Sequence, residues 1–144
     1  IKEMSVTTIT TSQAPDAKPV AINEIVTTNW KVIADVPNYK VPELVFGGSE
    51  TVEPGVGEII SPLVLCNTTN SSVMIDLRFH RDEANAEFYV LRNMPVTAYE
   101  TTPIPLNGQF LKSGDTLEIK ASANLAIHAT LSFTQGQSEE DDVV

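Results

Sequence analysis

LEIKASANLAIHATLSF, residues 117–133, contains two runs in which apolar and polar residues alternate. Successive side chains of a β-strand point to opposite faces of the sheet, so a period of two predicts strands with one buried face. The short connection Ser122–Asn124 between the runs is typical of a turn, and we therefore predict an antiparallel hairpin here. The residues expected to face the core are Leu117, Ile119 and Ala121 in the first run and Leu125, Ile127, Ala129, Leu131 and Phe133 in the second.

Further strands are predicted upstream by the same alternation and by apolar runs that turn residues bound on both sides. The ranges are 30–36, 59–66, 73–79 and 88–91. The clearest of them is 73–79, in which Val73, Ile75, Leu77 and Phe79 are expected to face the core.

Prolines and glycines mark where regular pairing is interrupted. Pro62 lies inside the run 59–66, and this predicts an edge position or a bulge, because proline donates no hydrogen bond to a neighbouring strand. Residues 39–58 contain many breakers and are predicted to form a long loop with one short strand near Leu44–Phe46. Three prolines confine residues 96–106 to extended, edge-like structure.

The pattern as a whole predicts an all-β fold. Seven or eight short strands separated by turn residues are typical of an antiparallel two-sheet sandwich, and no segment has the periodicity of an amphipathic helix. Cys66 is the single cysteine, so an internal disulfide is excluded, which argues against a disulfide-bridged immunoglobulin domain. Jelly-roll and immunoglobulin-like connections are both compatible with the pattern.

Composition divides the chain into three segments. Residues 1–29 are rich in Thr, Ser, Ala and Pro and contain no aromatic residue, so we predict an extended N-terminal arm that folds only by docking. Residues 30–135 are predicted to form the sandwich domain, which should remain folded without the arm. Residues 136–144 include four consecutive acidic residues and are predicted to be a mobile acidic tail.

The charge balance bears on the classes of partner. The chain of 144 residues carries 19 acidic and 9 basic side chains, a formal net charge of −10. Direct contact with nucleic acid is not expected, because binding phosphates requires a surface rich in Lys and Arg. A membrane partner is not expected either, because no segment approaches the roughly 18 apolar residues of a membrane-spanning helix.

Signatures of catalysis and of metal binding are not found. The chain has no G-x-S-x-G, H-E-x-x-H, P-loop or G-x-G-x-x-G motif, and we predict a protein that is not an enzyme and needs no cofactor. The only histidines are His80 and His128, far apart in the sequence. The loop 80–87 combines His80 with three carboxylates but lacks the ligand spacing of a calcium loop, so no metal site is predicted.

Two groups of residues are predicted to form interfaces. Apolar side chains in the arm can add a strand to a neighbouring sheet, and three arginines on or beside neighbouring strands can form a basic patch. These arginines either pair with Asp76 and Glu87 in the same domain or meet an acidic partner, and pairing within the domain is favoured. The predicted interface residues are Ile9, Val20, Ile22, Ile25, Val26, Arg78, Arg81 and Arg92.

The second half of the chain resembles a family of virion proteins. The motifs VMIDLRF, EFYVLRNMPV, IPLNGQF and LKSGDTLEIKASANLAIHATLSFT follow one another from Val73 to Thr134. Their order is similar to that in small structural proteins of tailed bacteriophages, particularly marine and cyanobacterial ones, and the resemblance covers residues 59–134. The resemblance implies a non-enzymatic β-sandwich present in many copies on the virion. The arm and the acidic tail lie outside it.

The expected function is therefore that of a capsid decoration, or cement, subunit. Such a subunit binds the major capsid protein or other virion proteins and forms homo-oligomers through its arm and sheet edges. A neck, collar or tail accessory protein of the virion is the alternative within this class. A carbohydrate- or receptor-binding module is the alternative from another class, and it requires Tyr39, Phe46, Tyr89 and Tyr99 to gather on one face.

Overall fold

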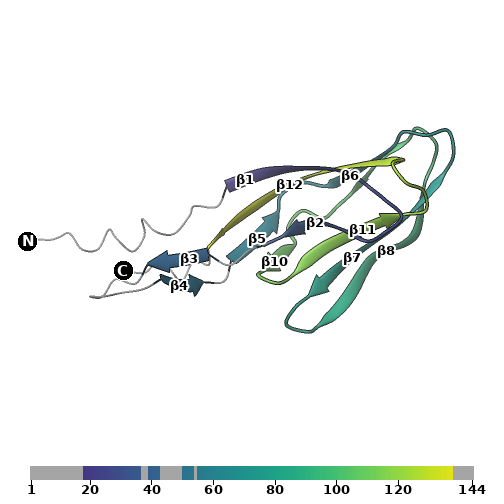
Figure 1. The fold of residues 1–144 in the computed structure, drawn as a ribbon. Coiled ribbons are helices and arrows are strands. Elements are labelled where there is room, and N and C mark those ends of the chain that lie inside the picture. Colours follow the sequence, from purple (N-terminus) through teal and green to yellow (C-terminus); the bar gives the residue numbers. More distant parts are fainter. Residues whose placement is uncertain (1–17, 37–38, 43–49, 54, 138–144) are drawn as a thin grey trace, which may run out of the picture.

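The fold is built from β-strands (Figure 1). A computed structural model describes residues 18–36, 39–42, 50–53 and 55–137, and no helix occurs in these ranges. The strands are β1 (Lys18–Ile25), β2 (Lys31–Asp35), β3 (Tyr39–Pro42), β4 (Glu50–Glu53), β5 (Gly55–Ile59), β6 (Leu63–Asn67), β7 (Val73–Arg81), β8 (Ala86–Val96), β9 (Thr101–Ile104), β10 (Phe110–Lys112), β11 (Thr116–Ala121) and β12 (Ile127–Gln137).

Ten of these strands form two antiparallel sheets. In the first sheet the order is β10-β5-β12-β6-β9, and β1 pairs with β12. In the second sheet the order is β2-β11-β7-β8. Strands β3 and β4 pair with each other as a separate ribbon. The predicted antiparallel two-sheet sandwich is therefore confirmed.

The strand order is that of a jelly roll. β5 and β6 both pair with β12, so together they occupy one strand position of the sheet, with an interruption between them. β10 pairs with β5 and β9 pairs with β6, so β10 and β9 together occupy the next strand position. Each sheet then contains four strand positions, and the chain moves between the sheets as in two successive Greek keys. Of the two connection patterns compatible with the sequence, the strand order selects the jelly-roll-like one.

Pro62 marks the interruption between β5 and β6. The Ile60 amide donates to the Ser132 carbonyl (3.0 Å), and the Ser132 amide donates to the Ser61 hydroxyl (2.8 Å). A side-chain oxygen therefore replaces a backbone acceptor where the proline breaks the ladder. The predicted irregularity is present, but it lies inside the sheet, between β12 on one side and β9 and β10 on the other.

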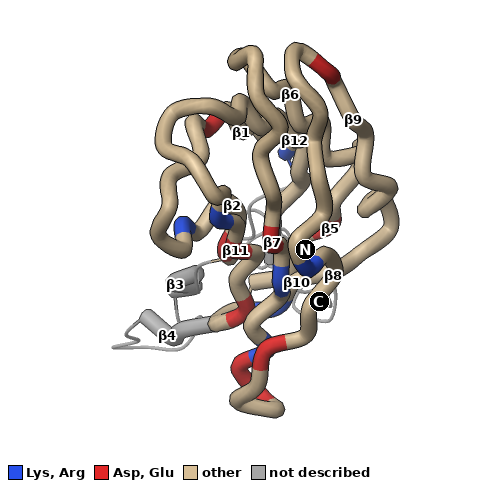
Figure 2. The backbone as a smooth tube through the Cα atoms, turned by 90° about the vertical axis from the view of Figure 1, so that its right-hand side faces the viewer, with Lys and Arg blue, Asp and Glu red and all other residues tan. Residues whose placement is uncertain are grey.

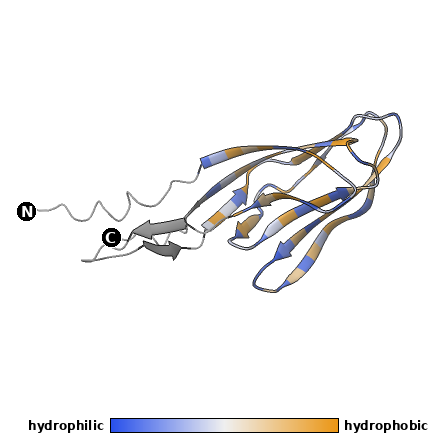
Figure 3. Ribbon diagram, viewed as in Figure 1, coloured by the Kyte–Doolittle hydropathy of each residue, from blue (hydrophilic) through white to orange (hydrophobic). Residues whose placement is uncertain are grey.

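The core lies between the sheets and follows the predicted alternation (Figure 3). In β7 all four residues expected to face inward are buried, and the three expected in β11 are buried as well. In β12 the prediction holds from Ile127 to Phe133. It is wrong for Leu125, which is 66% exposed, while Ala126 is buried. Leu125 has a φ of 59°, so it belongs to a turn and the strand alternation begins only after it.

The predicted hairpin between residues 117 and 133 is wrong. β11 pairs with β2 and β7 in the second sheet, whereas β12 pairs with β1, β5 and β6 in the first. The connection 122–126 therefore crosses from one sheet to the other. Two alternating strands with a short link present the same sequence pattern whether they pair with each other or face each other across the core.

The predicted long loop over residues 39–58 also requires correction. Strands β3, β4 and most of β5 lie within that range, and their ladders include Pro42, Gly55 and Gly57. Gly55 and Gly57 are buried in β5, and at Gly57 the absence of a Cβ atom allows the close approach of the Phe133 ring. The short strand predicted near Leu44–Phe46 lies outside the described residues.

The boundary predicted between arm and sandwich is wrong for residues 18–29. β1 pairs with β12 over its full eight residues, and Val26 is completely buried in the core. The sequence does not identify β1 as a strand of the sandwich, because β1 is paired on one side only and most of its side chains are exposed. Residues 1–17 and 138–144 lie outside the described residues, and β12 continues through Gln137, two residues beyond the predicted end of the sandwich.

Candidate interaction surface

The predicted interface residues of the arm lie at the edge of the first sheet. Val20 and Ile25 are 37% and 45% exposed, so both are accessible to a partner. Ile22 is partly buried against the core, and Val26 is a core residue that no partner can reach. Ile9 lies outside the described residues. Among the described residues, the accessible part of this prediction is therefore limited to the edge strand β1.

The three predicted arginines do not form one patch. Arg78 and Arg92 lie on the outer face of the second sheet, and Arg81 lies at the end of the β7–β8 hairpin. Arg78 and Arg81 each pair within the domain, but with Glu118 and Asp115 and not with the carboxylates suggested by the sequence. Within the ranges described, Arg92 makes no ion pair. Asp76 accepts a hydrogen bond from the Asn93 amide (2.6 Å), and Glu87 contacts the His80 ring (2.9 Å).

Cationic and aromatic side chains alternate across the outer face of the second sheet. The Arg78 guanidinium carbon lies 3.8 Å from the centre of the Trp30 ring, and that of Arg92 lies 4.2 Å from the Tyr89 ring centre. The Trp30 and Tyr89 rings are 6.1 Å apart and inclined by 20°. The Lys120 ammonium lies 5.0 Å from the Trp30 ring centre. We call Trp30, Arg78, Tyr89, Arg92 and Lys120 the cation–aromatic ladder.

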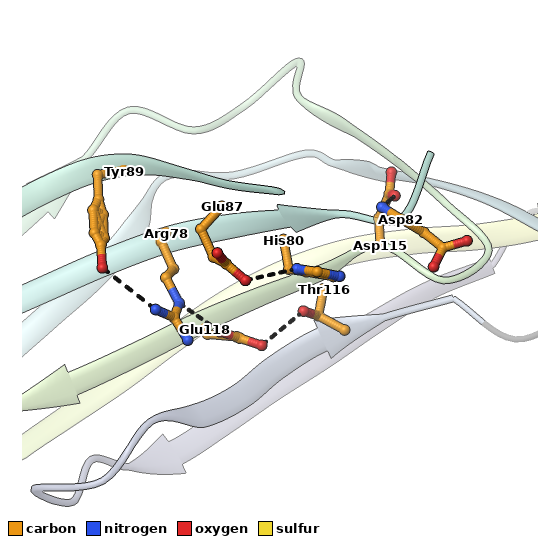
Figure 4. Close-up of polar contacts among 8 residues, drawn as sticks. All are labelled: Arg78, His80, Asp82, Glu87, Tyr89, Asp115, Thr116 and Glu118. Carbon is orange, nitrogen blue, oxygen red and sulfur yellow. Dashed lines mark hydrogen bonds and ion pairs between the residues drawn. The ribbon is translucent and has the colours of Figure 1, made fainter. Parts of the chain in front are cut away.

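The strand register brings the ladder together. Arg78 on β7 lies opposite Glu118 on β11 and opposite Tyr89 on β8. The Arg78 Nε atom contacts Glu118 at 2.7 Å, and its guanidinium donates to the Tyr89 hydroxyl at 3.4 Å (Figure 4). Burial lowers the pKa of Arg78, but its bonds to Glu118 and Tyr89 outweigh that effect and raise the pKa above its ordinary value. The guanidinium is therefore a permanent charge held in a fixed position.

Sequence reasoning found only part of the ladder. Arg78 and Arg92 were predicted to form an interface, whereas Trp30 and Lys120 were not. The alternation of residues 117–121 places Lys120 on the outward side, but it does not reveal that β2 is the neighbour of β11. Trp30 reaches the ladder through that pairing, so the strand order is the missing information.

A second feature lies at the end of the β7–β8 hairpin, where acidic positions gather (Figure 2). An open hollow of about 490 Å³ is lined by Arg81, Phe88, Phe110, Lys112, Asp115 and neighbours in the 83–84 turn. Phe88 and Phe110 are 52% and 56% exposed, although each lies on a strand of the sandwich. Arg81 donates to the Phe110 carbonyl (2.6 Å) and to Asp115 (3.2 Å), which connects the two sheets beside the hollow.

Asp115 is the buried anion that organises this end of the sandwich. It is 6% exposed and accepts hydrogen bonds from the backbone amides of Asp82 (2.9 Å) and Lys112 (3.0 Å) and from Arg81. Burial raises the pKa of Asp115, but these three donors outweigh burial and lower the pKa below its ordinary value. The folded state therefore favours the ionised carboxylate of Asp115.

We expect Asp115→Asn to lower the free energy of unfolding at neutral pH by about 1–3 kcal/mol, because the three donors lose their charged acceptor. Since the pKa is lower in the folded state, the stabilisation is complete above the ordinary value of 3.8 and is lost as pH falls through the folded pKa. Urea unfolding of both proteins from pH 7 down to acid measures this. The difference between them should shrink below pH 3.8; a constant difference would contradict the assignment.

The aromatic cluster that a carbohydrate-binding module would need is not seen among the described side chains. Tyr89 lies within β8, whereas Tyr99 lies in the turn after that strand, where its amide donates to the Thr69 carbonyl. Stacking of a sugar on the Tyr89 ring is further limited by the neighbouring Arg92 and Trp30. The side chain of Tyr39 and all of Phe46 lie outside what the structure describes.

The described residues provide neither a metal site nor a membrane-spanning helix. The described part of the chain holds no group of three or more His, Cys, Asp or Glu side chains placed to bind a metal ion. In the same part of the chain, no helix has the length and apolarity needed to cross a bilayer.

Comparisons with known proteins give little further information. No protein-family model matches the chain, and no curated protein matches it. Among solved structures, the chain is similar to one described as "Structure of Eiger TNF from S. frugiperda", at 12% identity and a TM-score of 0.28, over 83% of this chain and 92% of that chain. A likeness at this level carries no argument about fold or function. The resemblance to phage virion proteins stays a prediction.

Proposed function

We propose that the protein is a non-enzymatic structural subunit of a tailed-phage virion, most simply a capsid decoration subunit. In this role it binds the major capsid protein or another virion protein and also binds copies of itself. The proposal rests on the resemblance of residues 59–134 to such proteins and on the surface of the second sheet.

The cation–aromatic ladder is the observation that carries the proposal. Trp, Tyr and Arg are the residue types that contribute most to protein–protein binding, particularly where a fixed geometry reduces the entropy lost on association. Tyr89 is 42% exposed, and Arg78 is fixed between Glu118 and two rings. The ladder therefore offers a rigid docking face on the outer side of the second sheet.

Labelling of virus particles tests the location. An antibody raised against the purified chain should label gradient-purified particles of a tailed phage whose genome encodes the chain, as seen in electron micrographs. Labelling spread over the shell supports a decoration subunit, and labelling confined to the neck or tail supports an accessory protein instead. Unlabelled particles, with the antibody reacting to the purified chain, would contradict the proposal.

A pair of variants tests the docking face. In this test, purified chain is added to phage particles that do not contain the chain, and the amount that sediments with them is measured. We expect Tyr89→Ala to reduce this binding by about tenfold or more, because a hot-spot tyrosine contributes about 2 kcal/mol or more to binding. Tyr99→Ala is the matched control, since Tyr99 is 70% exposed and lies away from the ladder. Equal binding of the two variants would exclude the ladder as the contact.

A further inference from the structure

Strand β8 presents a long open edge. It spans eleven residues, pairs with β7 on one side, and has no partner strand on its other side within the described chain. The backbone amides and carbonyls along that side can therefore pair with another strand. Phe88, Tyr89 and Val90 are 52%, 42% and 38% exposed, so three consecutive large apolar residues lie along the same edge.

The side chains of β8 divide between the two faces of the sheet in a defined way. Phe88 lies opposite the core residue Phe79, and Leu91 packs against the core, so both belong to the inner face. A register shift leaves Val90 as an extra residue between the pairs Arg78–Tyr89 and Leu77–Leu91. On the outer face, Glu87 contacts His80. Arg92 also belongs to that face, because its guanidinium lies over the Tyr89 ring.

We propose that the occupant of this edge is β8 of a second copy of the chain, paired antiparallel about a twofold axis. In the register that we infer, Glu87 lies opposite Arg92 of the second copy, Phe88 opposite its Leu91, and Tyr89 opposite its Val90. Inner-face residues then meet inner-face residues, and Glu87 meets Arg92 on the outer face. The twofold axis produces each of these pairs twice.

Charge selects this register over its neighbours. A register that places Glu87 opposite the same residue of the second copy brings two carboxylates together. A register centred on Arg92 brings two guanidinium groups together. Opposite charges facing each other across a strand pair are favourable and like charges are unfavourable. Arg92, which makes no ion pair with any described residue, acquires a carboxylate partner only in the register that we propose.

The dimer joins the two second sheets into one sheet that continues through both copies. The ladder of one copy reaches β8 through Tyr89 and Arg92, with Tyr89 next to the axis, so the ladders of both copies lie on the same continuous face. Edge pairing also covers Phe88, Tyr89 and Val90, the exposed apolar residues of the strand. One surface thus provides backbone pairing, apolar contact and two ion pairs.

Charge reversal tests the pairing in solution. Sedimentation velocity of the whole chain over a range of concentrations should show a reversible dimer. Glu87→Arg and Arg92→Glu should each weaken dimerisation by about tenfold or more, because two attractive pairs become repulsive. The double variant should recover the affinity to within about threefold, since the pairs are restored with reversed signs. Glu83→Arg, in the turn that precedes β8, controls for the change in net charge.

Several outcomes would overturn the inference. They are a natural chain that remains monomeric, single variants that dimerise as well as the natural chain, or a double variant that stays as weak as either single one. Circular dichroism of each variant establishes that it is folded. His80→Gln separates the loss of the internal Glu87 contact from the loss of the dimer.

Cross-linking tests the register directly and needs no change of charge sign. In a Cys66→Ser background, chains with Glu87→Cys and with Arg92→Cys are mixed and oxidised. Disulfide-linked dimers should form in the mixture much faster than in either variant alone, because the two positions lie opposite each other only between copies. Equal rates in all three samples would contradict the register.

This inference deepens the proposed function, because it assigns one sheet edge to the contact between copies. The two are tested separately. The dimer is measured with purified chain in the absence of particles, and the virion location is measured by antibody labelling of particles, which does not depend on Tyr89, a residue shared by the ladder and the dimer edge. A monomeric chain that still labels virions would refute only the dimer, and a dimer that labels no particle would refute only the virion proposal.

Discussion

A chain that begins at Lys18 is expected to fold, whereas a chain that lacks residues 1–29 is expected to be largely unfolded at 25 °C. The shorter chain loses β1, which pairs with β12 over eight residues. It also loses Val26, which is completely buried and bonded by its amide to the Ile127 carbonyl (2.9 Å). Removing a strand together with a core residue has an effect comparable to the whole stability of a small domain, about 5–15 kcal/mol.

Urea unfolding followed by circular dichroism of the full chain and both truncated chains measures the effect. The chain from Lys18 retains every described strand, so it is the matched control for shortening as such. A cooperative transition of the chain from Trp30 at the same urea concentration as the full chain would contradict the assignment of β1 to the sandwich. It would restore the boundary that composition predicts.

Gly57→Ala is expected to lower the free energy of unfolding by about 2–4 kcal/mol, because overpacking of a tight core site forces its neighbours to move. A Cβ atom at this position would lie 2.2 Å from the Cζ atom of Phe133 and 2.9 Å from the Thr134 carbonyl oxygen. Phe133 is 2% exposed and packed in the core, so its ring has little freedom to turn away. Thermal unfolding of the two proteins measures the loss.

Two further variants identify the cause. Gly108→Ala replaces a glycine with a φ of 96° and no atom within 4 Å of the added Cβ, so it should cost only the backbone strain of about 1 kcal/mol. In a background of Phe133→Leu, Gly57→Ala should cost less than in the natural chain, because the smaller side chain leaves space. An undiminished cost there would show that the ring is not the obstacle.

Which face of each strand is buried was predictable, because burial of one face requires apolar residues at every second position of the local sequence. Val73, Ile75, Leu77 and Phe79 are all buried, as their alternation indicates. The pairing of the strands was not predictable from this alternation. The runs joined by Ser122–Asn124 read as a hairpin although they belong to opposite sheets, because a buried face looks the same toward either kind of neighbour.

The candidate surface was predictable to the same limited degree. Outward positions such as Arg78 follow from alternation, but their partners follow from pairing between strands that are far apart in the chain. Arg78 lies between Glu118 and Tyr89 because β7 lies between β11 and β8. Likewise, β1 has few buried side chains to signal that it is a strand of the sandwich, since most of its residues face solvent.

The central position of β12 has a consequence for how the protein is made. β12 is the last described strand to leave the ribosome, yet β1, β5 and β6 all pair with it. The second sheet needs only β2, β7, β8 and β11, so all of its members are available earlier in synthesis. We therefore expect that the first sheet assembles only after β12 has left the ribosome, and that β1 stays unpaired until then. Lys18, Asn23 and Glu24 interrupt the apolar residues of β1 and suit that interval, because a strand without polar residues would be more prone to aggregation while it is unpaired.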